Sequence, residues 1–266
     1  MSAASPTFVL HAPKDALWCD TTDELVYRIA LSHRVALRSP DGSQRFYQDH
    51  AAGTEVSALA LGSYRGVVVA SAAGDDGITH VWRSAELQTV AVLQRPEASG
   101  PVVSLCFSAD DDLLLVLEQP SQPVLSLWGW RGGQCLSSVQ AHAEPARVAL
   151  AVGPTLFMSA SAAAVRFWRL ESEGGGAEAL QPVVTRGGGA ACALALDAAQ
   201  RGGGDGACIT GDDGGMLKLW SAAEGQLIVR QAAHHGAVRA LCRCATPPSA
   251  PPPAPPAPPP CPRRPR

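Results

Sequence analysis

The sequence predicts an all-β fold, a β-propeller, from the recurrence of one strand type and from the turns around it. Short alternating strands end at Trp82, Trp128, Trp168 and Trp220, which lie 46, 40 and 52 residues apart. A similar strand that recurs roughly every 40–50 residues is typical of a propeller, in which each repeat forms one blade. Gly, Asp and Pro separate the strands, and no window sustains the apolar spacing of a helix. Because one blade cannot bury both of its sheet faces, each repeat needs neighbours.

The strands group in fours, which sets the expected domain organisation. The propeller region covers residues 1–242, with about five blades and a partial sixth, at 16–47, 56–93, 102–139, 147–185, 191–230 and 237–242. We therefore expect an incomplete ring, and an open ring leaves two apolar sheet faces bare. A fragment of a longer protein, closure by another chain, and an irregular five-blade ring are the alternatives, and the sequence favours the fragment because the pattern stops after 242.

Three segments fall outside the repeats. Residues 171–178 and 201–206 are rich in Gly and predict flexible surface insertions. Neither has the Lys-Ser/Thr pair or the Gly spacing of a phosphate-binding loop. The segment 243–266 is dominated by Pro, Ala and Arg, which predicts a disordered tail. Within it, residues 259–264 fit P-x-x-P-x-Arg, a weak match to ligands of SH3-type grooves.

Composition excludes several classes of protein. No apolar run approaches the roughly 18 residues that span a bilayer, and the first ten residues lack the features of a secretory signal. The net charge of −3 argues against nucleic acid as the main partner, because phosphate binding depends on clustered Lys and Arg. We therefore expect a cytoplasmic protein that binds neither membrane nor nucleic acid.

The polar residues that could suggest chemistry have simpler interpretations. Cys106, Cys192 and Cys208 lie in apolar strands and are expected to be buried, reduced thiols. The pair at 242 and 244 fits no common zinc spacing. Runs of Asp at 75–76, 110–112 and 212–213 fit turns, where Asp bonds its own backbone, better than catalytic carboxylate pairs. We expect no cofactor, no metal and no enzymatic activity.

One repeat resembles a WD repeat closely enough to assign roles. His50, the strand 55–61, Ser71, the turn Asp76-Gly77 and Trp82 occur in the order of that family. The resemblance implies a buried hydrogen-bonded set of His, Ser or Thr, Asp and Trp that braces the blade. A buried indole N–H does need an acceptor, which makes this role physically reasonable.

The other repeats match this brace only in part. The fourth has no turn Asp, the fifth has no His, and the third has neither. The predicted brace residues are His50, Ser71, Asp76, Trp82, Trp128, His142, Ser159, Trp168, Thr210, Asp213 and Trp220.

Within this family, the first 240 residues most resemble the microtubule- and cilium-associated branch, which includes the echinoderm microtubule-associated-protein-like and centriolar WD-repeat proteins. The stretches at 24–27, 34–37, 44–61, 103–113 and 125–130 carry the resemblance. It implies a non-catalytic scaffold in a centriole, cilium or microtubule assembly, with tubulin or a centriolar or axonemal protein as partner.

A generic adaptor in ubiquitin ligation, trafficking or ribosome assembly is the alternative, and a propeller enzyme is a further one. Blade rims would make the contacts, and the rim candidates are Tyr64, Arg65, Arg83, Trp130 and Arg131.

Overall fold

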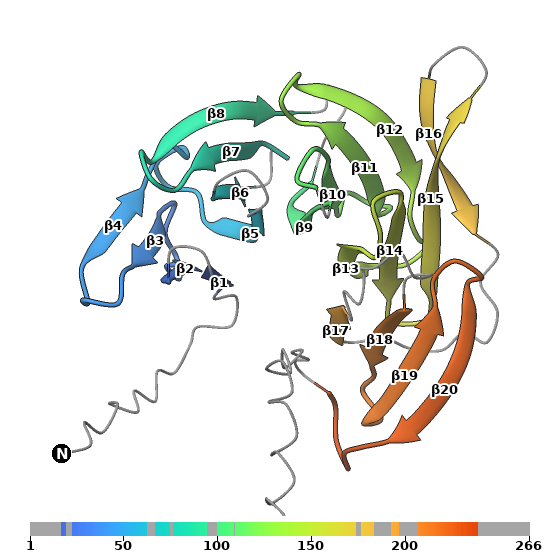
Figure 1. Cartoon of the computed structure of the whole chain (residues 1–266). Helices are drawn as coiled ribbons and strands as arrows, with labels where there is room; N and C mark the ends of the chain where they lie inside the picture. Colours follow the sequence, from blue (N-terminus) through green and yellow to red (C-terminus); the bar gives the residue numbers. More distant parts are fainter. Residues whose placement is uncertain are drawn as a thin grey trace, which may run out of the picture.

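The computed structural model describes residues 17–19, 23–62, 67–74, 77–94, 100–108, 110–173, 177–183, 193–196 and 207–238 (Figure 1). Every element of regular secondary structure within these residues is a β-strand, and the strands form five four-stranded antiparallel sheets. The prediction of an all-β fold built from repeated sheets is therefore confirmed. Residues 239–242 of the predicted sixth repeat and the tail at 243–266 lie outside the described residues.

Each sheet consists of four strands that are consecutive in the chain. The first contains β1 (Leu17–Cys19), β2 (Glu24–Arg28), β3 (Val35–Arg38) and β4 (Gln44–Tyr47). The second contains β5 (Val56–Gly62), β6 (Val68–Ala73), β7 (Thr79–Arg83) and β8 (Gln88–Leu93). The third contains β9 (Val102–Phe107), β10 (Leu114–Glu118), β11 (Val124–Gly129) and β12 (Gln134–Gln140).

The last two sheets repeat the arrangement. The fourth contains β13 (Ala146–Ala151), β14 (Leu156–Ser161), β15 (Val165–Glu173) and β16 (Ala177–Val183). The fifth contains β17 (Ala193–Leu196), β18 (Ala207–Gly211), β19 (Met216–Ser221) and β20 (Gln226–Ala232).

The prediction that residues 171–178 form a flexible surface insertion is partly wrong. Residues 171–173 continue β15, and Glu173 pairs with Ala177 at the start of β16. The hairpin therefore runs well past the part of the sheet that packs on its neighbours. Strand pairing satisfies backbone N–H and C=O groups whatever the side chains are, so polar residues can prolong it. The second predicted insertion, at 201–206, lies outside the described residues.

The sheets follow one another along an arc, and each packs face to face on the next (Figure 1). The first strands of the sheets line the inner side of the arc and the fourth strands lie on its outer side. Contacts between β5 and β9, between β9 and β13, and between β13 and β17 join the sheets along the inner side. The arc is open between β1 and β17 (Figure 1).

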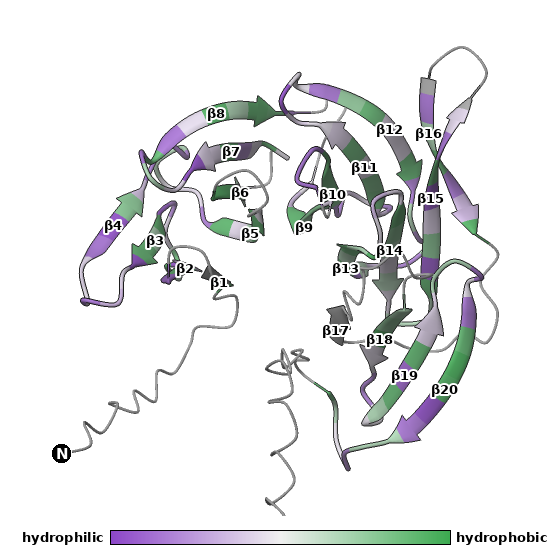
Figure 2. Ribbon diagram, in the orientation of Figure 1, coloured by the Kyte–Doolittle hydropathy of each residue, from purple (hydrophilic) through white to green (hydrophobic). Residues whose placement is uncertain are grey.

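Period-two alternation divides each internal strand between two apolar cores. In β10, Leu114 and Val116 pack with the second sheet, whereas Leu115 and Leu117 pack with the fourth. Successive side chains of a strand point to opposite faces, so a strand buried on both sides reads as continuously apolar. Four such clusters fill the four spaces between the five sheets. Figure 2 shows β14, inside the stack, as largely hydrophobic and the outer strand β20 as a mixture of hydrophobic and hydrophilic stretches.

Candidate functional site

A hydrogen bond from an indole to a hydroxyl recurs in four successive sheets. The donor is the Nε1–H of the tryptophan near the end of the third strand. The distances are 3.0 Å for Trp82 to Ser71, 3.0 Å for Trp128 to Ser126, 2.8 Å for Trp168 to Ser159 and 2.9 Å for Trp220 to Thr210. All four tryptophans are buried, so each indole N–H needs this acceptor. We call this repeated contact the indole brace.

The strand register explains why the brace recurs. In every case the hydroxyl belongs to the cross-strand pair two residues before the tryptophan. These pairs are Ser71 with His80, Val116 with Ser126, Ser159 with Arg166, and Thr210 with Lys218. Residues two apart on a strand share a face, so the hydroxyl lies beside the indole whichever strand supplies it.

The third sheet takes its hydroxyl from an unexpected strand. Ser126 is on β11, the same strand as Trp128, and it replaces the second-strand serine or threonine of the other three braced sheets. Sequence reasoning placed Trp128 in the brace and missed Ser126. A signal was present, because Ser126 is the single polar residue in the apolar run 124–128.

Histidines extend the brace in the second and fourth sheets, as the resemblance implied. Nε2 of His50 lies 2.7 Å from Oγ of Ser71, and Nε2 of His142 lies 3.0 Å from Oγ of Ser159. Burial is the largest cause, and together with the charge of His80 beside His50 and of Arg166 beside His142 it lowers the pKa of each imidazole to about 4. Both rings are therefore neutral at pH 7, and each serine links an indole to an imidazole.

In the fifth sheet, Lys218, the cross-strand partner of Thr210, forms an ion pair with Asp212. Nζ of Lys218 lies 3.0 Å from a carboxylate oxygen of Asp212, and both side chains are nearly buried. Burial raises the pKa of Asp212, but hydrogen bonds from the Met216 and Gly214 backbones and from Lys218 outweigh it, so the net shift is downward.

The prediction that Asp213 belongs to the brace is wrong. Its side chain is 60% exposed, and a carboxylate oxygen lies 3.5 Å from Arg147 of the fourth sheet. In a turn with two adjacent aspartates, Asp212 accepts the backbone N–H groups of residues 214 and 216 and is held inward. Sequence spacing alone did not distinguish the two. Asp76 lies outside the described residues.

Where the first and second sheets meet, the brace continues into a wider polar network. Tyr47 stacks on Trp82 with ring centroids 4.2 Å apart and planes 2° apart. Its hydroxyl lies 2.7 Å from Nδ1 of His80 and 2.7 Å from Oγ1 of Thr89, and Thr89 donates to Asp49 at 2.6 Å. This network joins β4 to β7 and β8. The third strand of the first sheet, β3, carries no tryptophan. In this sheet it is Tyr47, at the end of β4, that supplies a buried aromatic ring.

The prediction that Trp130 lies at the rim is also wrong, because this side chain belongs to the core. It is 5% exposed, packs with Phe107 of β9, and donates its indole N–H to the backbone oxygen of Asp111 at 2.7 Å. Arg131 covers its outer side, with the guanidinium carbon 4.4 Å from the ring centroid. The chain turns after β11, so Trp130 folds back under the neighbouring turn instead of pointing to solvent.

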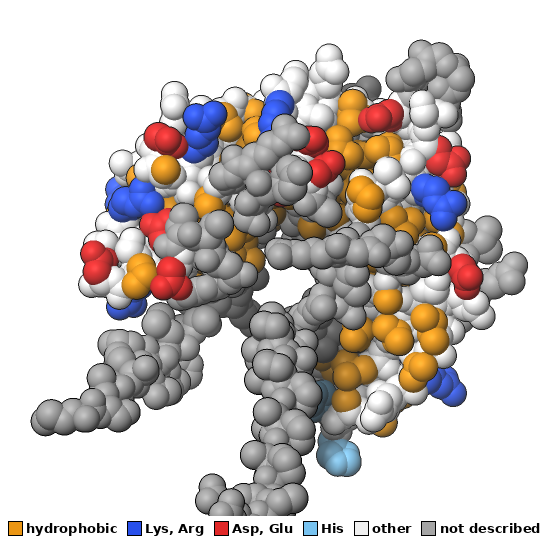
Figure 3. All heavy atoms as spheres, viewed as in Figure 1, with side chains coloured by type: hydrophobic (Ala, Val, Ile, Leu, Met, Phe, Trp, Pro, Cys, Tyr) orange, Lys and Arg blue, Asp and Glu red, His pale blue; other side chains and the backbone are white. Residues whose placement is uncertain are grey.

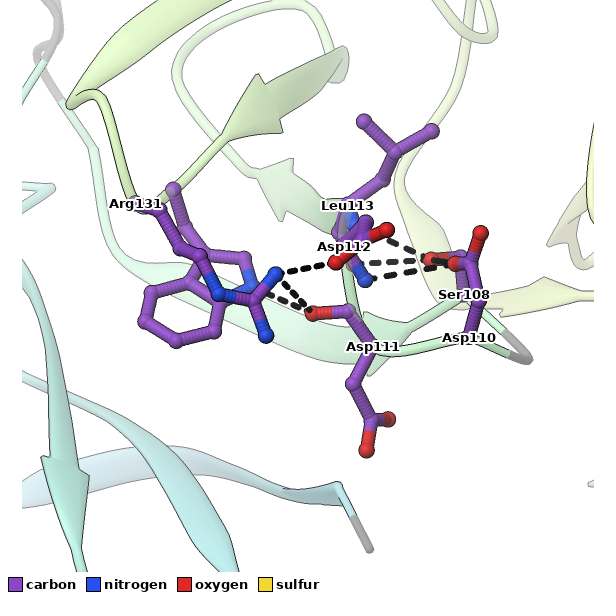
Figure 4. Close-up of polar contacts among 7 residues, drawn as sticks. Ser108, Asp110, Asp111, Asp112, Leu113 and Arg131 are labelled. Carbon is purple, nitrogen blue, oxygen red and sulfur yellow. Dashed lines mark hydrogen bonds and ion pairs between the residues drawn. The ribbon is translucent and has the colours of Figure 1, made fainter. Parts of the chain in front are cut away.

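Arg131 and the β9–β10 turn form one hydrogen-bonded unit, drawn in Figure 4. Arg131 donates to the carboxylate of Asp112, while Asp110 accepts bonds from the Ser108 hydroxyl at 2.6 Å and from the Asp112 backbone at 3.2 Å. The Asp111 carboxylate points away from the other two (Figure 4). Burial raises the pKa of Asp110, but these bonds outweigh it and lower the pKa overall. The three carboxylates thus diverge and serve the turn.

Two of the thiols in the described strands, Cys106 and Cys208, are packed among apolar residues, whereas Cys135 of β12 is exposed. Cys106 and Cys208 are not in disulfides, and burial raises their pKa values to about 11 and about 12. A thiol reacts as the thiolate, so neither is a reactive nucleophile at neutral pH. Cys192 lies outside the described residues.

The described ranges hold no group of three His, Cys, Asp or Glu side chains placed to bind a metal ion. None of these described residues forms a helix that is long and apolar enough to cross a membrane. A depression of about 580 Å³ opens where the first three sheets meet, with Arg28, Glu55 and Val103 among the residues that line it. Arg28 donates to the Val56 carbonyl at 3.0 Å and Glu55 accepts the Leu31 N–H at 3.3 Å, so both charged groups stabilise the local fold.

Comparison with known proteins adds information on the fold alone. No protein-family model matches the sequence. Among solved structures, the chain is similar to the computationally designed Ika8 protein, with a TM-score of 0.65 and 19% sequence identity. The match covers 87% of this chain and 65% of the designed chain, so this chain spans less than two thirds of that protein's length.

Proposed function

We propose that the chain is an incomplete β-propeller of the WD-repeat kind and that it acts as a non-catalytic scaffold for other proteins. The indole brace is the observation that supports this most strongly. The same bond, at the same cross-strand pair, occurs in four successive sheets that pack face to face. A repeated brace of this kind gives a rigid array of sheets whose turns form extended surfaces.

The use of polar groups favours binding over chemistry. Catalytic sites gather groups with shifted pKa values in an open cleft. Here the shifted pKa values of His50, His142, Cys106 and Cys208 all have burial as their largest cause, and these side chains lie inside the sheet stack. Asp112, Asp212 and Glu24 are each paired with a basic side chain. The described polar residues thus serve the fold.

We place the binding surface on the side of the arc at which the third strands of the sheets end. All sheets have the same strand order and antiparallel pairing, so their third strands end on one side of the molecule. Arg83, Arg131 and Arg169 are exposed there. Arg83 is the last residue of β7, Arg131 follows the end of β11, and Arg169 follows Trp168 within β15. Tyr64 and Arg65, the other rim candidates, lie outside the described residues.

The charge of this surface suits a partner with an acidic segment. Arg83 of the second sheet and Arg169 of the fourth offer positive charge on either side of the third sheet, where Asp112 neutralises part of the charge of Arg131. On the face seen in Figure 3, basic and acidic side chains are interspersed, with no broad basic area. Recognition of a short acidic segment fits this pattern better than docking on a wide acidic lattice.

We further propose a cytoplasmic setting in a centriole, cilium or other microtubule assembly. The resemblance of the first 240 residues to that branch of WD-repeat proteins supports this setting, and acidic segments of tubulin or of a centriolar or axonemal protein suit the arginine rim. A generic cytosolic adaptor is the alternative. Its partners would use the same surface.

Tagging the whole protein in a ciliated cell tests the setting, and charge reversal tests the surface. We expect the tag to mark centrioles or axonemes. The double variant Arg83→Glu/Arg169→Glu should lose this localisation, whereas Arg230→Glu, on the outer strand β20, should keep it. Diffuse signal for the unaltered protein would reject the ciliary setting, and retention by the double variant would reject the arginine rim.

A further inference from the structure

The first sheet is held in the arc by a single junction. It lies at one end of the arc, and among the described sheets only the second shares an apolar cluster with it (Figure 1). Val26, Val35 and Leu37 of the first sheet pack there with Val69 and Trp82 of the second. An end sheet can therefore separate without disturbing the other sheets, which pack on one another through their own clusters.

Two imidazole rings are stacked inside this junction. His50, in the segment between β4 and β5, and His80 of β7 have ring centroids 4.3 Å apart and planes 16° apart. Tyr47 of β4 meets both rings edge-on, with centroid distances of 5.6 Å and 6.2 Å. Either imidazole can take up a proton, and two like charges at this distance in a buried place repel each other strongly. The closed junction therefore disfavours charging both rings.

The hydrogen bonds of His50 also oppose its protonation. Oγ of Ser71 accepts the indole N–H of Trp82 at 3.0 Å and lies 2.7 Å from Nε2 of His50. Within the described part of the chain, Nε2 is the one acceptor that the Ser71 hydroxyl proton has, so the neutral ring accepts it. A proton on Nε2 would leave that hydroxyl proton without an acceptor at a fully buried position.

A second chain of hydrogen bonds determines which nitrogen of His80 carries a proton. Thr89 donates its hydroxyl proton to Asp49 at 2.6 Å, so it accepts the hydroxyl proton of Tyr47 at 2.7 Å. The Tyr47 oxygen then accepts the Nδ1–H of His80 at 2.7 Å. Neutral His80 thus has its proton on Nδ1, and acid adds a second proton at Nε2. The charge of His80 can change while this chain of bonds stays intact.

The charged groups that act on His50 are unequal in number. Burial is the largest cause that lowers the pKa of His50 to about 4, and the charges of His80 and of His33, in the β2–β3 turn, lower it too. The carboxylate of Asp49 raises it. Asp49 is exposed and also accepts the Thr89 hydroxyl, so it offsets only part of the repulsion among the three histidines.

We propose that this junction is an acid-sensitive latch, in which protonation of the stacked His50 and His80 releases the first sheet while the other four sheets stay together. The fourth sheet gives the contrast. His142 lies 3.0 Å from Ser159 in the same way, but its charged neighbour is Arg166, whose charge is constant, and its sheet packs on both faces. Protonation of His142 therefore weakens the chain without freeing a sheet.

The direction of the latch follows from proton uptake. In a released first sheet, His50 is exposed to water and its pKa returns to near 6.5. Because the open form then binds more protons than the closed form, opening becomes more favourable as the pH falls below about 6.5. The latch depends on the junction of two sheets and holds whether or not the arginine rim binds a partner.

Amide hydrogen exchange of the whole chain across this pH range tests the latch. After correction for the intrinsic pH dependence of exchange, amides of β2–β4 should lose at least about 10-fold more protection than those of β10 and β14 between about pH 7 and about pH 5. Far-UV circular dichroism should show that the remaining sheets are folded at the lower pH. Loss of protection in step in all sheets would overturn the proposal, since the chain would then open as one unit.

Two variants should move the midpoint of this loss in opposite directions. His80→Gln keeps a side-chain N–H for Tyr47 and removes a titrating ring, so the first sheet should stay protected to about one pH unit lower. Asp49→Asn keeps an oxygen for Thr89 and removes the favourable charge, so protection should be lost at least about half a pH unit higher.

His142→Gln is the matched control, because it removes the corresponding ring from an internal sheet. It should leave the midpoint for β2–β4 unchanged. Protection of β2–β4 at pH 7.5 shows that each variant is folded before the pH is lowered. A midpoint that neither His80→Gln nor Asp49→Asn moves would overturn the proposal, and so would an equal change produced by His142→Gln.

Discussion

At the scale of the residue, a single serine hydroxyl connects two larger buried side chains. Ser159 accepts the indole N–H of Trp168 at 2.8 Å and lies 3.0 Å from Nε2 of His142. All three side chains are buried, so each depends on the others for a hydrogen-bond partner. The cost of removing the hydroxyl should therefore exceed that of one lost hydrogen bond.

Ser159→Ala should lower the free energy of unfolding by about 2–4 kcal/mol, because it leaves two buried polar groups unsatisfied. Ser172→Ala, at an exposed position of the same sheet, should change it by less than about 0.5 kcal/mol. Urea unfolding followed by tryptophan fluorescence measures both. Equal stability of the two variants would mean that the serine does not join the brace.

The two buried histidines predict how stability depends on pH. Their pKa values are about 4 in the folded chain and lie near 6.5 when unfolded. The unfolded chain therefore binds more protons between these limits, and stability falls as the pH falls from about 6.5 to about 4. Urea unfolding at intervals across this window should show the decline. The double variant His50→Gln/His142→Gln should be less stable at pH 7 and should show a much flatter profile. An unchanged slope would contradict this account.

At the scale of the element, the cross-strand pair is the unit that repeats, and its residues vary. The pair beside each tryptophan is Ser–His, Val–Ser, Ser–Arg or Thr–Lys, yet every pair supplies a hydroxyl. In the fifth sheet, Lys218 of this pair also forms an ion pair with Asp212. The four sheets therefore share the geometry of the brace, although different residues form it.

The turn between β18 and β19 gives a direct comparison of two adjacent carboxylates. Asp212→Ala should lower the free energy of unfolding by about 3 kcal/mol, because it removes two backbone caps and the carboxylate that pairs with the nearly buried Lys218. Asp213→Ala should cost less than about 0.5 kcal/mol, because its only described ion pair is exposed. Urea unfolding compares them, and a larger loss for Asp213 would reverse the assignment.

Sequence patterns predicted the elements better than the site. Tryptophan spacing and period-two alternation predicted the strands that end at Trp82, Trp128, Trp168 and Trp220, because these signals come from local geometry. Ser126 was missed because either strand of a pair can supply the hydroxyl, and register is set only on folding. Trp130 was misplaced because the chain turns after β11, which alternation cannot show. The prediction made the β15–β16 hairpin too short, because it assumed that a polar sequence ends a strand, whereas polar residues do not prevent backbone pairing.

At the scale of the whole molecule, stacking supplies what a single sheet lacks. Strands such as β10 and β14 have apolar residues on both faces, and neighbouring sheets cover both. The junction of the first two sheets adds a polar network from Tyr47 to Asp49, so apolar packing and hydrogen bonds both resist their separation. A rigid array of this kind can present loops at fixed spacing, which is what a scaffold requires.

The most direct measurement of this account is hydrogen exchange at the indole nitrogens, followed by nuclear magnetic resonance of the chain labelled with ¹⁵N-tryptophan. If four successive sheets bury their indoles against hydroxyls, the Nε1–H signals of Trp82, Trp128, Trp168 and Trp220 should exchange at least about 100-fold more slowly than free indole. Ser126→Ala should accelerate exchange at Trp128 more than at the other three. Exchange of all four at the rate of free indole would contradict the stacked, braced sheets on which the proposed scaffold depends.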